Sequence, residues 1–144
     1  KAAVICDKEF SAENALKTVE KVAENLGMHV IYMKAEDHDI HTAYISHISH
    51  ITSYALANTV LEKEREEDTI FQLASSGFSS TVRLAKSHPE MWVPIFKQNK
   101  ENVLDVLNEH ISQLRKFKSA LEKDNDELLE ELIRNANKIR GILK

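Results

Sequence analysis

Glycine, proline and cysteine are all scarce in this sequence, whose 144 residues include three glycines, two prolines and one cysteine. Because glycine and proline favour turns, their scarcity indicates long helices joined by few connections. A single cysteine, Cys6, excludes an internal disulfide and is typical of a reducing, cytoplasmic compartment. Basic residues are not in excess either, since the formal net charge is −4. We therefore expect neither a nucleic-acid partner nor attachment to anionic lipid.

Charged side chains are absent from the 22 residues Ile40–Leu61. A helix of this length measures roughly 33 Å and would reach across a bilayer. The segment nevertheless contains three histidines and several hydroxyl side chains, which are costly against lipid but can be satisfied inside a protein. The composition therefore predicts no membrane span. It predicts the buried central helix of a mostly helical domain.

The first third of the sequence has a β-α-β pattern. Ala2–Cys6 and Met28–Met33 are apolar segments typical of strands. Between them, Ser11 is the expected N-cap of a helix and Gly27 its expected terminator with positive φ. Helical spacing relates the apolar residues Ala15, Val19, Val22 and Leu26. Two strands do not make a stable sheet alone, and the chain opens without an initiator Met, so we interpret it as a fragment that expects further strands upstream.

Helices are expected throughout the rest of the chain. The pattern predicts one long helix over Asp37–Glu67 and a broken helical stretch over Thr69–Lys86. Pro89 is expected at the first position of the next helix, and Lys97–Lys123 has apolar residues at helical spacing. An Asp124-x-x-Glu127 capping box is expected to start the last helix.

His47 is the most informative residue of the uncharged segment. It is expected on one helical face with Ile40, Ala43, Tyr44, His50, Ile51, Tyr54, Asn58 and Leu61. Burial there favours a neutral imidazole. Sequence statistics favour a core histidine bonded to a carbonyl or a serine; the alternative is a pocket histidine that accepts a hydrogen bond from substrate.

Two histidine pairs, His38-x-x-His41 and His47-x-x-His50, also suggest metal ligands. No cysteine joins them, and neither pair has a recognised zinc spacing with an acidic partner. We therefore predict no metal site. A helical metal protein stays as a hypothesis that would require stoichiometric metal after purification.

Arg83 is the only charged residue between Asp68 and Lys86. Its guanidinium either faces solvent at a helix edge or points into a cleft, where its planar fork would bind a carboxylate at two points. Trp92 follows nine residues later. It is expected as an anchor of the core or of an interface, and it is able to wall the same cleft.

Four stretches of the chain together resemble the prephenate dehydrogenase family. They are Ser46–His50, Gly77–Phe78, the uninterrupted run Thr81–Trp92, and Asn99–Val103. The resemblance covers essentially the whole chain and implies a mainly α fold. Residues 1–35 would be the incomplete C-terminal end of a Rossmann-type NAD(P)-binding domain, and residues 36–144 an all-helical substrate-binding and dimerisation domain.

The resemblance also implies a reaction and roles for particular residues. Members of this family oxidatively decarboxylate prephenate, or the related arogenate, with NAD or NADP on the route to tyrosine. The catalytic histidine, which accepts a hydrogen bond from the ring hydroxyl, would be His47. Arg83 would bind a substrate carboxylate, and Thr52 and Trp92 would line the pocket. The family's intertwined homodimer would explain a helix that is apolar or small on both faces.

The sequence departs from a complete enzyme of this kind. With glycines only at positions 27, 77 and 141, it contains no Gly-x-Gly-x-x-Gly dinucleotide fingerprint. We therefore expect the cofactor to bind mainly upstream, and the chain alone to be inactive. Ser49 stands where the family often has proline, which does not disturb the helix. A non-catalytic helical dimer module that binds a small carboxylate, such as tyrosine, is the alternative function; the choices between prephenate and arogenate and between NAD and NADP stay open.

Overall fold

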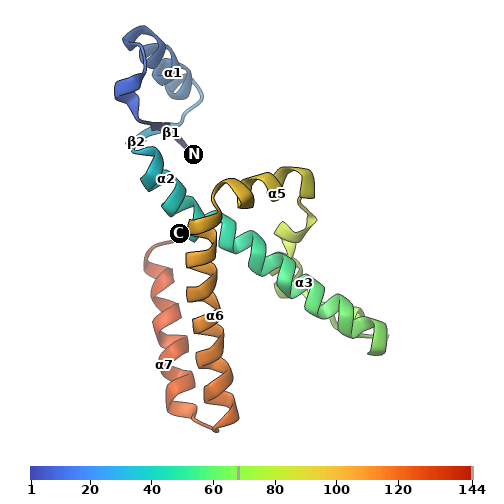
Figure 1. Cartoon of the computed structure of the whole chain (residues 1–144). Helices are drawn as coiled ribbons and strands as arrows, with labels where there is room; N and C mark the ends of the chain where they lie inside the picture. The colour runs from blue at the N-terminus through green and yellow to red at the C-terminus, as the bar shows by residue number, and fades with distance from the viewer. Residues whose placement is uncertain (68, 144) are drawn as a thin grey trace. The chain divides into compact units, whose positions relative to one another are not determined.

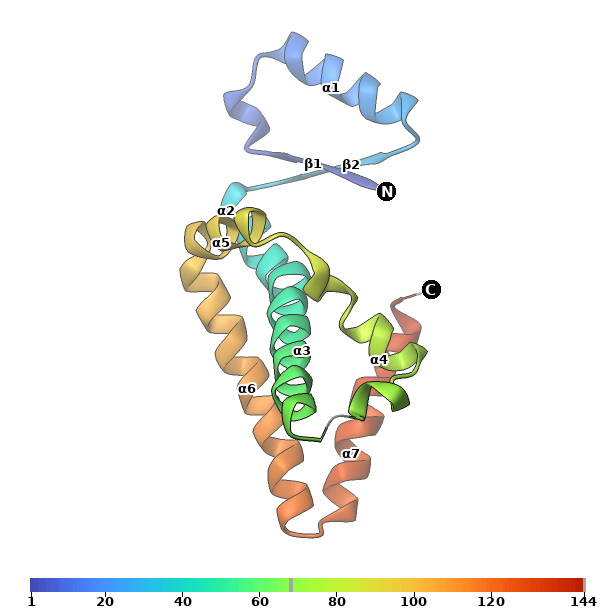
Figure 2. The same cartoon turned by 90° about the vertical axis from the view of Figure 1, so that its right-hand side faces the viewer.

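The N-terminal part of the protein is a parallel strand–helix–strand unit in a computed structural model that describes residues 1–67 and 69–143. Strand β1 (Ala2–Cys6) pairs with β2 (His29–Met33), from Ala2 opposite His29 to Cys6 opposite Met33. Helix α1 (Glu13–Asn25) lies over one side of this sheet (Figures 1 and 2). The predicted strands and the positive φ of Gly27, 66°, are confirmed.

The predicted N-cap of α1 is wrong. The N-cap residue is Ala12, which makes no side-chain capping bond. Ser11 instead ends a short 3₁₀ turn, η1 (Lys8–Phe10), because its backbone N–H donates to the Lys8 carbonyl. The helix therefore begins two residues beyond Ser11.

The long helix predicted over 37–67 is present, with a widened turn in it. Helix α2 (Ala35–Thr42) continues through a π turn, η2 (Ala43–His47), into α3 (Ile48–Glu67). The Ile48 N–H donates to the Ala43 carbonyl five residues back, which defines the wide turn. Side chains that bond carbonyls of a helix are one cause of such departures, and Asn99 bonds the Asp39 carbonyl just before this turn. Wide turns of this kind are frequent at functional sites.

The uncharged segment is less buried in the single chain than the sequence predicts. Ala43, His47, His50 and Ser53 are buried, whereas Ile40, Tyr44, Ile45 and Leu61 are exposed. The predicted face assumed a constant helical period, and the π turn shifts it. The sequence predicts a buried helix that a second subunit helps to cover, so the side chains exposed in the single chain leave that prediction untested.

Ser53 holds the segment that follows α3 against this helix. The segment consists of η3 (Ile70–Leu73), α4 (Ser76–Thr81) and η4 (Arg83–Lys86), which confirms the predicted break. The Ser53 hydroxyl, 1% exposed, donates to the Thr81 carbonyl at 3.1 Å and accepts the Ala85 N–H at 3.0 Å. Both ends of the turn that carries Arg83 are thus tied to α3.

The C-terminal helices are α5 (Pro89–Gln98), α6 (Lys100–Glu122) and α7 (Asp126–Asn137), followed by the 3₁₀ turn η5 (Lys138–Gly141). Pro89 starts α5 as predicted, but α6 starts at Lys100 and not at Lys97. The protein forms two compact units, Lys1–Val103 and Leu104–Lys144, and α6 contributes residues to both. In the part of the chain that the structure describes, no helix combines the length and apolarity needed to cross a membrane.

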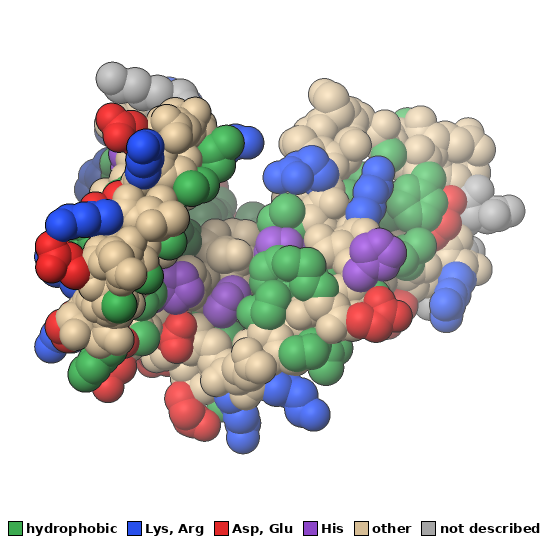
Figure 3. All heavy atoms as spheres, turned by 90° about the horizontal axis from the view of Figure 1, so that it is seen from above, with side chains coloured by type: hydrophobic (Ala, Val, Ile, Leu, Met, Phe, Trp, Pro, Cys, Tyr) green, Lys and Arg blue, Asp and Glu red, His purple; other side chains and the backbone are tan. Residues whose placement is uncertain are grey.

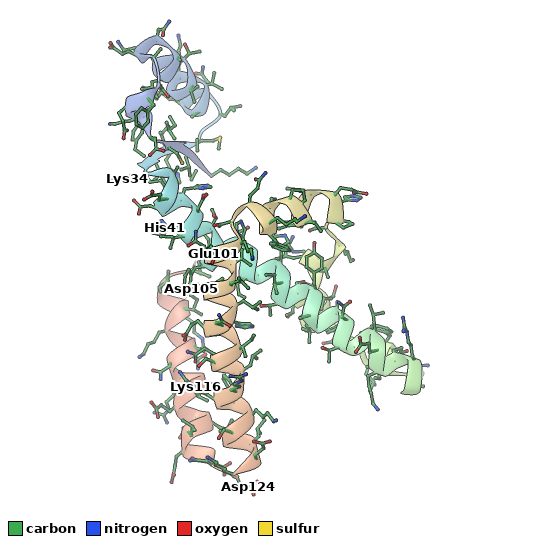
Figure 4. All side chains as sticks on the ribbon, in the orientation of Figure 1. Lys34, His41, Glu101, Asp105, Lys116 and Asp124 are labelled. Carbon is green, nitrogen blue, oxygen red and sulfur yellow. The ribbon has the colours of Figure 1, made fainter. Side chains whose placement is uncertain are left out.

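The predicted capping box at Asp124 is wrong by one residue. Asp124 lies at the turn between α6 and α7 (Figure 4) and has a left-handed φ of 50°. It therefore belongs to the turn and does not cap the helix. Asn125 is the N-cap, and its side-chain oxygen accepts the Leu128 N–H at 2.9 Å.

Candidate functional site

A cleft of about 460 Å³ lies between the helical turns that lead into α3 and helix α5. This volume is in the range of small-molecule sites. One side is lined by His38, Asp39, Thr42, Ser46 and His47, and the other by Met91, Trp92, Ile95, Gln98 and Asn99. On the face shown in Figure 3, histidine side chains are interspersed with hydrophobic ones. The cleft thus combines apolar walls with a small number of polar groups.

His47 ends the π turn and is 8% exposed. Its Nδ1 lies 3.3 Å from the amide nitrogen of Asn99. That same nitrogen donates to the Asp39 carbonyl at 2.7 Å, and the Asn99 side-chain oxygen accepts from Asn102 at 2.8 Å. Asn99 therefore links the ring to the backbone of α2.

Burial lowers the pKa of His47 below its ordinary value. The negative charge of Asp39 partly opposes this shift, and the neighbouring His50 and His38 add to it. His47 is therefore neutral at neutral pH.

The lowered pKa of His47 predicts a loss of stability in mild acid. In the unfolded chain this histidine titrates near about pH 6.5, above its folded-state pKa, so the unfolded state binds more protons below that pH. Its contribution to the free energy of unfolding is complete above this range and falls as the pH drops toward the folded-state pKa. Urea unfolding at a series of pH values should show a smaller acid loss for His47→Gln than for the original chain. The matched control is His41→Gln, at an exposed histidine of α2; equal acid losses in His47→Gln and the original chain would contradict the assignment.

Aromatic rings hold the α5 side of the cleft together. Trp92 is buried and stacks on His50, with ring centroids 3.4 Å apart. The His47 ring meets Trp92 and Phe96 edge-on, at 6.1 and 6.3 Å. The His50 Nδ1 lies 2.9 Å from the Ser46 carbonyl, which identifies it as a donor within its own helix. His50 is thus fixed by packing and by one hydrogen bond.

Of the four residues singled out from the sequence, the structure brings two together. His47 and Trp92 line the same cleft, whereas Thr52 and Arg83 are not among its lining residues. Thr52 lies half-buried in α3, and Arg83 is exposed at the start of η4. Sequence reasoning assigned no role to Asn99, although the residue opens one of the stretches that resemble the family. Apart from that resemblance, the only feature that could have drawn attention to Asn99 is its amide side chain, which lies at the break between α5 and α6.

The residues at the carboxyl ends of the two strands do not fit a dinucleotide. Parallel sheets bind pyrophosphate there through a glycine-rich turn and a helix N-terminus. Here β1 leads into Asp7, Lys8 and Glu9 with no glycine, and the adjoining pocket also contains Lys34 and Glu36. A turn without glycine does not let the backbone approach a pyrophosphate as the dinucleotide fingerprint does. Across residues 1–67 and 69–143, no three His, Cys, Asp or Glu side chains gather closely enough to hold a metal ion.

The fold and the cleft define a helical domain that follows the end of an α/β unit and has a ligand-sized cleft in its first part. Residues 34–135 match the model of the prephenate dehydrogenase dimerization domain. The chain therefore belongs to the prephenate dehydrogenase family.

Relatives and solved structures agree with this assignment. The chain is 30% identical over 154 residues to prephenate dehydrogenase of Bacillus subtilis, covering 97% of this chain and 42% of that protein. It is 31% identical over 122 residues to cyclohexadienyl dehydrogenase of Zymomonas mobilis, covering 84% and 42%. The structure of A. aeolicus prephenate dehydrogenase with hydroxyphenyl propionate and NAD+ has a TM-score of 0.87 and 30% identity, covering 100% of this chain and 50% of that one. The chain thus spans about half the length, or less, of these relatives.

Proposed function

We propose that this chain supplies the substrate-binding and dimerisation part of a prephenate or arogenate dehydrogenase. The proposed reaction with prephenate is an oxidative decarboxylation to 4-hydroxyphenylpyruvate, with NAD(P)+ as the oxidant, in tyrosine biosynthesis. The observation that carries the proposal is the cleft in which His47 and Trp92 meet, in a chain of this family. The cofactor would bind to a part of the enzyme outside this chain, because the strand edge present here does not fit it.

The side chains of the cleft suit a small cyclic acid. Trp92, Met91 and Ile95 present apolar surface that excludes water from a ring, while His47 and Gln98 offer polar atoms beside them. In this proposal Arg83 and Thr52 also bind substrate. Neither lines the cleft of the single chain, so their roles rest on the resemblance alone.

A homodimer is part of the same proposal. Ile40, Tyr44, Ile45 and Leu61 leave apolar surface exposed on the continuous helix, and Ile45 is 74% exposed. Burying such surface is the main favourable term in association. We propose that a second copy of the chain covers this apolar surface, which is consistent with the dimerization domain that the chain matches.

The proposal is tested by comparing the complete enzyme with the purified 144-residue chain. NAD(P)H formation should be observed with prephenate or arogenate for the complete enzyme and should be absent for the chain alone. Light scattering should give both proteins twice their chain mass. Turnover by the chain alone would disprove the proposal that the cofactor binds outside this chain. A complete enzyme that is inactive on both acids would disprove the proposed reaction and favour a binding module.

A further inference from the structure

We propose that Ser53 and Tyr54, two consecutive residues of α3, are positioning residues that place Arg83 for carboxylate binding. Neither side chain contacts substrate in this proposal, because both act through the short turn η4 that carries Arg83. The hydrogen bonds from α3 to the backbone around this turn are features of the structure. Only the binding of a substrate carboxylate by Arg83 rests on the proposed function.

The turn η4 is too short to fix its own position. It is a single 3₁₀ turn over Arg83–Lys86, and 3₁₀ hydrogen bonds have poorer geometry than those of an α-helix. Helical segments this short are unstable alone, so tertiary contacts determine where they lie. The chain that contains η4 runs beside α3 (Figures 1 and 2). The placement of Arg83 therefore depends on the bonds that α3 makes to this segment.

The Ser53 hydroxyl bonds the backbone on both sides of Arg83. It donates to the Thr81 carbonyl at 3.1 Å and accepts the Ala85 N–H at 3.0 Å. These directions are fixed, because a carbonyl oxygen only accepts and a backbone N–H only donates. Ser53 is 1% exposed, so water does not compete for either bond. One buried hydroxyl thus joins the residues that lie two positions before and two positions after Arg83.

Tyr54 adds a third bond just beyond the turn. Its hydroxyl donates to the Ser87 carbonyl at 3.3 Å. Two neighbouring side chains of α3 therefore hold the backbone at positions 81, 85 and 87. The side chain of Arg83, in contrast, is exposed. The backbone of this arginine is held while its planar fork of donors faces outward, which suits a group that binds a carboxylate.

Ser53 differs from the other hydroxyl residues of its helix. A hydroxyl inside a helix commonly bonds the carbonyl four residues earlier. Ser49 does so with the Ile45 carbonyl at 2.9 Å, and Thr59 with the Ala55 carbonyl at the same distance. Ser53 instead bonds residues that are 28 and 32 positions later in the chain. Its loss should therefore displace the turn and leave the helix itself intact.

The test measures kcat and KM of the complete enzyme for prephenate or arogenate, whichever acid it oxidises. Ser53→Ala should raise KM about tenfold with little change in kcat, because a binding group that is slightly misplaced loses much of its contact. Ser53→Cys, a weaker donor and acceptor, should give an intermediate KM. Tyr54→Phe removes one bond and should raise KM about threefold. Ser49→Ala is the matched control and should leave KM unchanged, since that hydroxyl bonds within its own continuous helix.

A double-mutant cycle tests whether Ser53 acts through Arg83. If it does, Ser53→Ala should change KM by less than about twofold once Arg83 is already alanine. An equal rise in KM with and without Arg83 would overturn the inference, because it would show a general effect on the fold. If Ser53→Ala does not fold, Ser53→Cys and Tyr54→Phe enter the same cycle, and an unchanged KM in both would also overturn it.

Two further outcomes separate this inference from the proposed function. A KM that rises in Arg83→Ala but not in folded Ser53→Ala would overturn the inference alone. A KM that is unchanged in Arg83→Ala would disprove carboxylate binding by Arg83, and the positioning role with it. Hydrogen exchange of the Ala85 amide in the complete enzyme requires no turnover and should be faster in Ser53→Ala than in the original protein. An unchanged exchange rate would overturn the inference whatever the activity of the enzyme.

Discussion

Replacing Arg83 by alanine in the complete enzyme should raise the KM for prephenate roughly ten- to hundredfold, with a small effect on kcat. A guanidinium binds a carboxylate through two parallel hydrogen bonds, and one charged hydrogen bond contributes about 1.5–3 kcal/mol. A factor of ten corresponds to about 1.4 kcal/mol. Since the interaction exists equally in the ground and transition states, its loss affects mainly KM. Steady-state kinetics with prephenate as the varied substrate measures it.

Two further substitutions make this test specific. Arg83→Lys keeps the charge but loses the planar fork, so its KM should lie between those of the original enzyme and Arg83→Ala. Lys86→Ala removes an exposed charge from the same η4 turn and should leave KM unchanged. A KM within twofold of the original value in Arg83→Ala would show that Arg83 does not bind substrate.

Replacing Trp92 by alanine should lower the free energy of unfolding by about 3–5 kcal/mol, as large-to-small changes of buried aromatics do. Trp92 is 7% exposed, stacks on His50 and contacts Phe96 at a centroid distance of 5.4 Å. Its removal leaves a cavity beside the cleft and exposes the face of His50. Because the chain has a single tryptophan, circular dichroism and not fluorescence should follow urea unfolding of the variants.

The comparison variants for Trp92 are chosen on the same helix. Trp92→Phe retains an aromatic ring and should lose less than half as much stability as Trp92→Ala. Val93→Ala, at a position 53% exposed, should change stability by no more than about 0.5 kcal/mol. A loss below 1 kcal/mol in Trp92→Ala would indicate that the cleft collapses around the missing ring.

Features with local causes were predictable from the sequence. The strand Ala2–Cys6 has the predicted bounds, and Gly27 and Pro89 have the predicted conformational roles. Each depends on residues that are neighbours in sequence. The two predicted helix caps were displaced because the turns before α1 and α7 take up Ser11 and Asp124. A capping residue is recognised only when the conformation of the preceding turn is known.

Features with distant causes were not predictable. A helical wheel assumes a constant number of residues per turn. No residue pattern within Ala43–His47 predicts the π turn that forms there. The hydrogen bond from Asn99 to the Asp39 carbonyl joins residues that are 60 positions apart in the chain. For the site, the resemblance selected His47 and Trp92, which the structure brings into one cleft. Thr52 and Arg83 do not line that cleft in the single chain, and their roles stay predictions.

The bonds from Asn99 to Asp39 and to His47 close loops of 60 and 52 residues. The entropy lost in closing such loops is recovered only once the partners have met, so contacts of this range slow folding. Before α5 reaches the long helix, His47 lacks both its contact with Asn99 and the burial that lowers its pKa. A nascent chain, or a peptide cut to residues 35–67, therefore lacks the chemistry of this histidine. His47 therefore acquires its lowered pKa and its contact with Asn99 only late in folding.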